Sequence, residues 1–203
     1  MHWYEKLNQY FPIEEMKSQE HMETLLRERA DVYHKDEGPH HVMMYVEAED
    51  FVFIDYVFVS SEARGQGIGR KLLDKLKAKG KPIILEVEPL DYEDSDTVKR
   101  RRFYDREDFR QAERVGYRRR SLATDRVNEL EILYWTPGEG YEDVDGEEVV
   151  FDAMRHTYEH IHTFRDVEFY GKAYQPVHEV LTLEGLPAPS GDGASKEVVV
   201  EAA

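Results

Sequence analysis

The chain has 203 residues, 40% of them hydrophobic, and its 27 basic and 43 acidic side chains give a formal net charge of −16. This charge disfavours nucleic acid and anionic membranes as partners and favours a cationic one. Because there is no cysteine, disulfide frameworks, thiolate metal sites and cysteine nucleophiles are excluded. The N-terminus shows no basic-then-apolar signal and no apolar run is long enough to span a membrane, so a cytoplasmic location is expected.

The N-terminal part of the chain favours helices. Helices are predicted over residues 2–10 and 12–30, the second starting at Pro12, a residue suited to the first turn of a helix. Acidic residues two and three positions later also suit a first turn, where the helix dipole favours negative charge. No strand is expected in this part, and residues 36–39 read as a turn.

An antiparallel hairpin is expected next, from a strand over residues 41–48 through a tight turn into a strand over 51–59. The second strand is apolar and rich in aromatic and β-branched side chains at nearly every position, which is typical of a strand covered on both faces. Asp55 is the exception. A carboxylate on an apolar strand is expected to be either paired or functional.

A glycine-rich loop follows this strand and leads into a helix. Three glycines stand two positions apart, and apolar residues then recur at helical spacing until Gly80. Such a loop aims free backbone N–H groups and a partial positive charge at one point, which suits a phosphate. Arg64, Arg70 and Lys71 add positive charge here to an otherwise acidic chain.

Three phosphate-binding patterns can be compared with residues 64–69, Arg-Gly-Gln-Gly-Ile-Gly. A Walker loop is excluded, because Gly69 is followed by Arg-Lys-Leu instead of Lys and then Ser or Thr. The dinucleotide fingerprint G-x-G-x-x-G is off by one position, although Glu86 and Glu88 stand at about the distance of its acidic residue. The pattern R-x-x-G-x-G after an apolar triplet fits at every position.

The triplet and the loop together resemble the pyrophosphate loop of the GNAT acetyltransferase superfamily, which binds acetyl-CoA. The resemblance implies that acetyl-CoA is the co-substrate and that it contacts Val57, Phe58, Val59, Arg64, Gly65, Gln66, Gly67, Ile68, Gly69 and Arg70. It implies an α/β fold of the α+β type, with a mixed, mostly antiparallel sheet whose central parallel pair splays apart, flanked by helices. The strand over residues 82–88 is then the parallel partner of the central strand, reached by a right-handed crossover.

A second motif indicates a general base, the group that would take a proton from the attacking amine. Leu85-Glu86-Val87 resembles the L-E-V run of protein N-terminal acetyltransferases in this superfamily, whose glutamate is the general base. The likeness implies that Glu86 is the base. Alternatively, Glu86 is a strand carboxylate whose hydrogen bonds are satisfied by its surroundings and which has no catalytic role. Glu88 and Asp55 are the rival candidates for the base.

A third motif lies in a helix expected over residues 97–114. Residues 103–109 resemble the F-Y-x-x-x-G-F signature of the same superfamily, with Asp108 in place of the glycine. The likeness implies that Tyr104 is the general acid that protonates the leaving thiolate. The alternative is a core aromatic, and the replaced glycine leaves open whether the helix ends there or at Gly116.

The predicted organisation is a GNAT-like domain of residues 1–144, a helical C-terminal extension of residues 145–186 and a flexible tail of residues 187–203. Strands over residues 117–122 and 130–134 close the domain.

The extension is expected to carry one amphipathic helix over residues 146–164, capped by Asp145. His156, His160 and His162 lie on this helix, but no third metal ligand is evident. They are therefore interpreted as a solvated helix face, and no metal is expected.

These features together predict an N-acetyltransferase that moves an acetyl group from acetyl-CoA to an amine by direct attack, with a cationic acceptor. A catalytically silent acyl-CoA-binding regulatory or interaction module is the alternative, and a nicotinamide-dependent oxidoreductase is more distant. Small-molecule amines, peptide N-termini and lysine side chains all remain open as acceptors, and so does a homodimer.

Overall fold

The chain forms one sheet with helices on its two faces. The computed structural model describes residues 2–121, 123–138, 141 and 145–185. The strands are β1 (Tyr33–Gly38), β2 (His41–Glu47), β3 (Val52–Val59), β4 (Ile83–Val87), β5 (Arg110–Gln111), β6 (Val115–Arg120), β7 (Val127–Trp135) and β8 (Leu181–Leu183). The helices are α1 (Trp3–Asn8), α2 (Gln19–Glu28), α3 (Ile68–Lys77), α4 (Ser95–Arg106), α5 (Gly146–Thr157), α6 (Asp166–Tyr170) and α7 (Val177–Val180), with a 3-10 turn η1 (Ser61–Ala63) and a π-helical turn η2 (Tyr158–His162).

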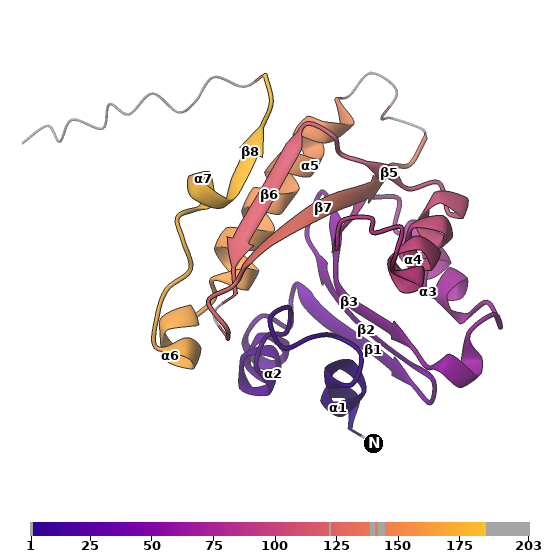
Figure 1. Cartoon of the computed structure of the whole chain (residues 1–203), viewed down its shortest axis with the longest axis horizontal. Coiled ribbons are helices and arrows are strands. Elements are labelled where there is room, and N and C mark those ends of the chain that lie inside the picture. The colour runs from indigo at the N-terminus through magenta and orange to yellow at the C-terminus, as the bar shows by residue number, and fades with distance from the viewer. Residues whose placement is uncertain (1, 122, 139–140, 142–144, 186–203) are drawn as a thin grey trace, which may run out of the picture.

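The strands follow the order β1-β2-β3-β4-β7-β6-β8, and β5 also pairs with β7. Every pair is antiparallel except β3 with β4 (Figure 1). The predicted mixed, mostly antiparallel sheet is confirmed. The strand β1 contradicts the prediction that no strand precedes the hairpin. Only Tyr33 is buried in it, so this edge strand lacks the apolar alternation by which a strand is recognised.

The parallel pair is short. It runs from Val52 opposite Ile83 to Ile54 opposite Leu85, although β3 continues for five residues and β4 for two. Beyond that point the strands diverge, and among the described residues no strand pairs with this side of β3. The predicted splay is confirmed. It leaves a gap in the middle of the sheet, with backbone hydrogen-bonding groups along its rim.

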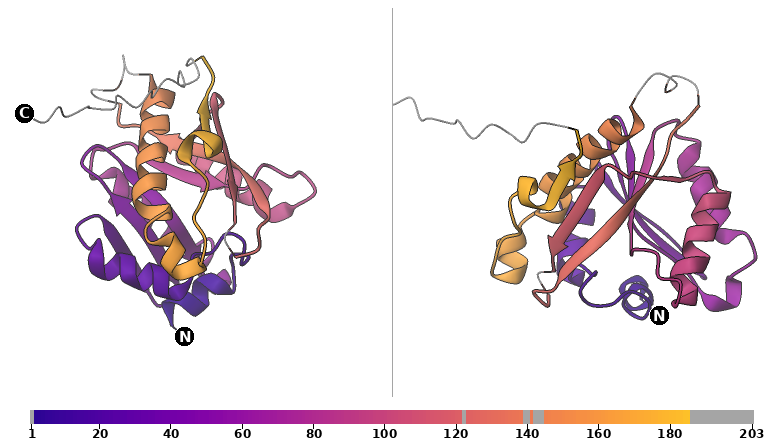
Figure 2. Two further views of the ribbon diagram at one scale, coloured as in Figure 1. Left: turned by 90° about the vertical axis from the view of Figure 1, so that its left-hand side faces the viewer. Right: turned by 45° about the horizontal axis from the view of Figure 1, so that its top comes forward.

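Helices cover both faces of the sheet (Figure 2). On one face α3 packs Leu72, Leu73 and Leu76 against Ile83 and Leu85 of β4. On the other face α1, α2 and α5 share a larger hydrophobic cluster with the strands. This two-sided cover explains why β3 is apolar on both faces. Within the described ranges, no helix combines the length and the apolar character needed to cross a membrane.

The prediction of a helix starting at Pro12 is wrong. The helix α2 begins seven residues later and is capped by Ser18, whose side chain accepts a hydrogen bond from the His21 N–H. The preceding segment is held in another conformation by the Tyr56 hydroxyl, which accepts from the Lys17 N–H at 3.0 Å and donates to the Glu15 carbonyl at 2.8 Å. These bonds to β3 override the local preference for a helix.

The helix α4 begins after Asp94, its N-cap, and ends at Arg106, so the predicted span of residues 97–114 is wrong at both ends. Asp108 adopts the left-handed conformation, with φ of 64°, and the Phe109 N–H bonds to the Tyr104 carbonyl at 3.1 Å. This is the geometry that a glycine usually provides at the end of a helix, and aspartate tolerates it better than most residues. The departure from the signature therefore leaves the helix end intact.

The extension packs into the main core. Asp145 caps α5 as predicted, and Val150 and Met154 are fully buried in the same cluster as β3 residues. The extension also adds a strand, because β8 pairs with β6. The predicted tail of residues 187–203 and Leu122, the predicted end of a strand, lie outside the described residues.

Because Met154 is fully buried in the shared core, Met154→Ala should destabilise the whole chain. The expected loss is about 2–5 kcal/mol in the free energy of unfolding, in a single cooperative denaturant transition. Arg155→Ala, at a neighbouring side chain that is 51% exposed, is the control and should change little. A separate early transition in Met154→Ala would show instead that the extension unfolds independently of the sheet.

Candidate active site

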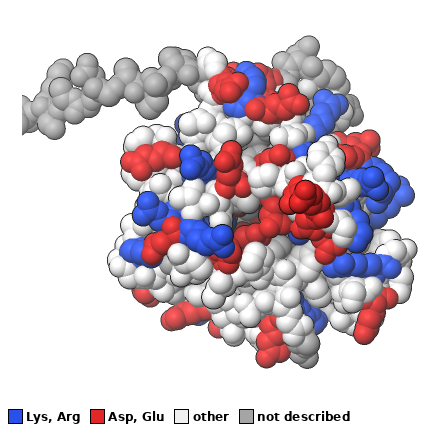
Figure 3. Space-filling view, viewed as in Figure 1, with Lys and Arg blue, Asp and Glu red and all other residues white. Residues whose placement is uncertain are grey.

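A pocket of about 520 Å³ opens where β3 and β4 diverge. Its walls come from β3, the glycine loop, the start of α3, the end of β4, α4 and two aromatic residues after α1. In Figure 3 a hollow lies near the centre of the molecule with acidic side chains around it, and Lys and Arg gather to one side, where Figure 1 places α3 and α4.

The pocket passes through the sheet. Ile54, Leu85 and Tyr104 line it and belong to the cluster on the α3 face. Phe11 and Tyr56 also line it but pack with the cluster on the opposite face. A ligand in this pocket can therefore enter from the helix α3 side and meet a second ligand from the α1 side.

The backbone of the glycine loop turns sharply into the start of α3. Gly65 and Gly67 have φ of 80° and 75°, which side chains rarely tolerate. Gly67 is the N-cap of α3 and supplies no side-chain bond, so the first N–H groups of the helix stay available for a ligand. Gly69 lies close to α4, since a Cβ there would be 3.1 Å from the Phe103 ring.

Most of the predicted cofactor residues lie on this pocket. The lining includes Val57, Val59, Arg64, Gly65, Gly67, Ile68, Gly69 and Arg70. The exceptions are Phe58, which packs against the cluster on the α1 face, and Gln66, which bonds to the Glu62 carbonyl.

Tyr10 is a pocket residue that the sequence did not single out. Two guanidinium groups contact its ring, those of Arg64 and Arg100, whose central carbons are 5.6 and 5.8 Å from the ring centre. Its hydroxyl accepts from Arg100 at 3.2 Å, and Arg100 also bonds to Glu88 at 3.1 Å. The ring thus holds two cations at the pocket wall.

Tyr104 lines the pocket from α4, with 3% of its surface exposed. Burial holds the pKa of its hydroxyl well above the ordinary value. The raised pKa keeps this hydroxyl protonated at neutral pH. Because it makes no hydrogen bond within the described chain, its proton is free to be donated to a ligand.

Glu86 lines the pocket from β4 and is held by two donors. His162 Nε2 lies 2.9 Å from one carboxylate oxygen, and Arg119 Nη2 lies 3.3 Å from the other. Burial acts to raise the pKa of Glu86, but Arg119 and His162 outweigh it and hold the pKa well below its ordinary value. Glu86 is therefore a carboxylate at neutral pH.

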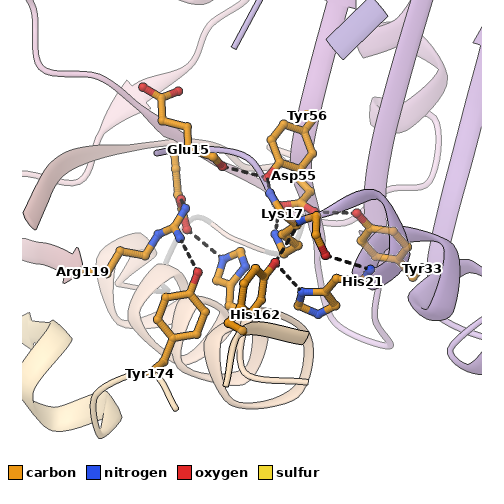
Figure 4. Close-up of polar contacts among 12 residues, drawn as sticks. Glu15, Lys17, His21, Tyr33, Asp55, Tyr56, Arg119, His162 and Tyr174 are labelled. Carbon is orange, nitrogen blue, oxygen red and sulfur yellow. Dashed lines mark hydrogen bonds and ion pairs between the residues drawn. The ribbon is translucent and has the colours of Figure 1, made fainter. Parts of the chain in front are cut away.

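Asp55 has the pairing that its place on an apolar strand required. Lys17 Nζ bonds to it at 2.7 Å and the Tyr33 hydroxyl at 2.6 Å, and both side chains of the ion pair are at most 4% exposed. Figure 4 shows this pair and the Arg119–Tyr174 contact approaching the same region from different segments, with His162 between them. Lys17 outweighs burial and lowers the pKa of Asp55.

Glu15, in the segment between α1 and α2, has a carboxyl whose pKa moves the other way. Burial, together with the neighbouring Glu88 carboxylate, raises the pKa of Glu15 to about 7, and Arg100 and Arg119 limit the rise. The predicted helix start at Pro12 would have placed Glu15 on a solvated first turn, so this environment could not be predicted from the local sequence.

The histidines of the extension divide into two kinds. His156 and His160 are exposed, as predicted, but His162 is fully buried, so the prediction of a solvated face is wrong for it. The spacing carried a signal, since His162 stands four residues after Tyr158 and eight after Met154, on the buried stripe. Across the described residues there is no group of three His, Asp or Glu that could hold a metal.

Glu15 should make stability depend on pH. Because its folded pKa of about 7 lies above 4.5, the ordinary value for a glutamate, its favourable contribution is complete below about pH 4.5 and is lost as the pH rises through 7. Glu15→Gln should match the parent at about pH 4 and exceed it by on the order of 2 kcal/mol at about pH 8. Urea unfolding across this range measures the difference. An equal effect of Glu15→Gln at both pH values would contradict the prediction.

Comparisons with known proteins agree with this geometry. Residues 28–111 match the family model described as an acetyltransferase (GNAT) domain. A Bacillus subtilis (strain 168) protein, YjbC, whose name describes it as a candidate acetyltransferase, is 58% identical over 183 residues, which cover 90% of this chain and 93% of that protein. A solved structure of a candidate GNAT-family acetyltransferase from Bacteroides thetaiotaomicron shares the fold, with a TM-score of 0.59 at 21% identity over 84% of this chain and 90% of its own. The expected family is confirmed: this chain belongs to the GNAT family of acetyltransferases.

Proposed function

We propose that this acyltransferase moves the acetyl group of acetyl-CoA to an amine by direct attack. The observation that carries the proposal is the pocket through the sheet, with an anion-binding loop on one face and carboxylates on the other. Each substrate of a two-substrate transfer then has its own entrance, and the reacting atoms meet in the gap.

The cofactor would lie along the gap. Its pyrophosphate fits the N-terminus of α3, where Arg64 and Arg70 add positive charge. Its pantetheine amides fit the backbone of residues 55–59, which has no strand partner on that side within the described residues. This path carries the thioester toward Tyr104 and Glu86.

Tyr104 is proposed as the acid. As the amine nitrogen attacks, a C–N bond forms at the carbonyl carbon, the C–S bond then breaks, and the leaving sulfur takes the Tyr104 hydroxyl proton. A hydroxyl with a raised pKa is fully protonated when the thiolate leaves. The tyrosinate regains its proton from solvent.

Glu86 is proposed as the group that accepts the amine proton, directly or through a water. Its lowered pKa keeps it ionised and attractive to an ammonium, and makes it a weak base. Arg119, Lys17 and Arg100 already balance the carboxylates of Glu86, Asp55 and Glu88.

The role of Tyr104 can be separated from packing. Tyr104→Phe should lower kcat by roughly 10²–10⁴-fold while the Kd for acetyl-CoA stays unchanged. Release of CoA thiol with a panel of amines measures turnover, and the chain adds no thiol of its own because it has no cysteine. Tyr92→Phe, at a side chain 84% exposed, is the control. Loss of acetyl-CoA binding in Tyr104→Phe would assign the residue a packing role.

Glu86→Gln keeps the shape of the side chain and removes its charge. We expect kcat/KM for the amine to fall by roughly 10²-fold or more, with the Kd for acetyl-CoA retained. Unchanged kcat/KM would remove Glu86 from the mechanism. Acetyl-CoA binding without turnover of any amine by the parent protein would favour the silent module.

A further inference from the structure

The groups that hold Glu86 lie outside the part of the chain that matches the family model. That match covers residues 28–111, whereas Arg119 lies on β6 and His162 on η2. Tyr174, also in the extension, bonds to Arg119 Nη1 at 3.3 Å. The pocket carboxylate is thus fixed by segments that the matched domain does not supply.

The contacts reach the pocket only through Glu86. His162 and Arg119 are 0% and 6% exposed in their side chains, and neither lines the pocket, whereas Glu86 does. Each carboxylate oxygen has one of these two donors, so both its position and its orientation are fixed.

The contact defines the tautomer of His162. An ionised carboxylate can only accept hydrogen bonds, so His162 Nε2 must carry the proton and donate. Burial, Lys17 and Arg119 lower the pKa of His162, and Glu86 raises it, with a net lowering that keeps the ring neutral. Its Nδ1 is buried and has no hydrogen-bond partner among the described residues, which is consistent with the unprotonated nitrogen.

A π-helical turn brings His162 to this place. The Thr163 N–H bonds to the Tyr158 carbonyl at 3.0 Å, a bond across five residues instead of the four of an α-helix. The wider turn buries Tyr158, Ile161 and His162 together against the sheet. The Phe53 ring packs edge-on to the imidazole at 5.6 Å and restricts its rotation.

We infer that His162 is a positioning residue for acetyl transfer, which keeps the Glu86 carboxylate ionised and directed into the pocket. The inference rests on the proposed role of Glu86. It also makes the C-terminal extension a part of the catalytic site.

Substitution of His162 should change the pH profile as well as the rate. In His162→Leu the charged Glu86 carboxylate loses one of its hydrogen-bond donors, and kcat/KM for the amine should fall by roughly 10- to 100-fold. Because protonation of Glu86 becomes easier, the fall of kcat/KM on the acidic side should begin at a higher pH in the variant than in the parent. The other charged or titratable groups around this contact are unchanged in the variant; they are Lys17, Arg119, Asp55, Glu15, His21, Tyr117 and Tyr174. His162→Gln keeps a neutral donor and should restore much of the rate and return the acidic fall of kcat/KM toward the pH at which it begins in the parent.

The controls separate this inference from the proposed function. His160→Leu changes an exposed histidine of the same turn and should leave rate and pH profile unchanged. The Kd for acetyl-CoA and the Tm are measured for every variant. If Glu86→Gln retains full turnover, the proposed role of Glu86 is overturned, and the inference about His162 falls with it. If Glu86→Gln loses turnover while His162→Leu keeps both rate and profile, the positioning role alone is overturned.

A measurement on the unaltered protein covers the case in which His162→Leu does not fold. In nitrogen-15 NMR with the histidine rings assigned, the His162 imidazole should stay neutral from about pH 8 down to about pH 6, protonated at Nε2, and its signals should change in Glu86→Gln. The assignment is needed because burial lowers the pKa of His21 to about 3, so that ring also stays neutral. A His162 ring protonated at Nδ1, or at both nitrogens in this range, would overturn the inference.

Discussion

Two buried ion pairs, Lys17 with Asp55 and Arg119 with Glu86, allow carboxylates to stand beside a gap in the core of this protein. An isolated carboxylate at this depth would take up a proton or destabilise the fold. Each pair also connects β3 or β4 to a segment distant in the chain. The same two ion pairs therefore neutralise the buried carboxylates and hold the segments of the site together.

The path from β3 through the loop to α3 could be predicted closely from the sequence, because every local signal agrees. A β-branched and aromatic strand, glycines that take positive φ and a helical apolar stripe each indicate the same arrangement. The error at the N-terminus has the opposite origin. Pro12 and the acids after it suit a helix locally, but Tyr56 and Ser18 impose another course through contacts that no window of sequence contains.

The buried polar network lies beyond such reasoning, since its partners are far apart. Lys17 and Asp55 are separated by 38 positions, and Glu86 and His162 by 76. Composition gives the residues but not which of them meet. The exception is His162, whose burial follows from helical spacing with Met154 and Tyr158, although its partner does not.

The divergence of β3 and β4 also bears on self-association. From Asp55 to Val59, β3 offers one side of its backbone as an edge strand does, but this edge lies inside the sheet and β4 and β7 continue beyond it. Exposed edges at the periphery of a sheet can recruit strands from other chains. An edge enclosed on both sides admits a narrow, flexible ligand and excludes a strand flanked by its own sheet. The protein can therefore keep unpaired backbone groups ready for a substrate without offering them to a second copy of itself.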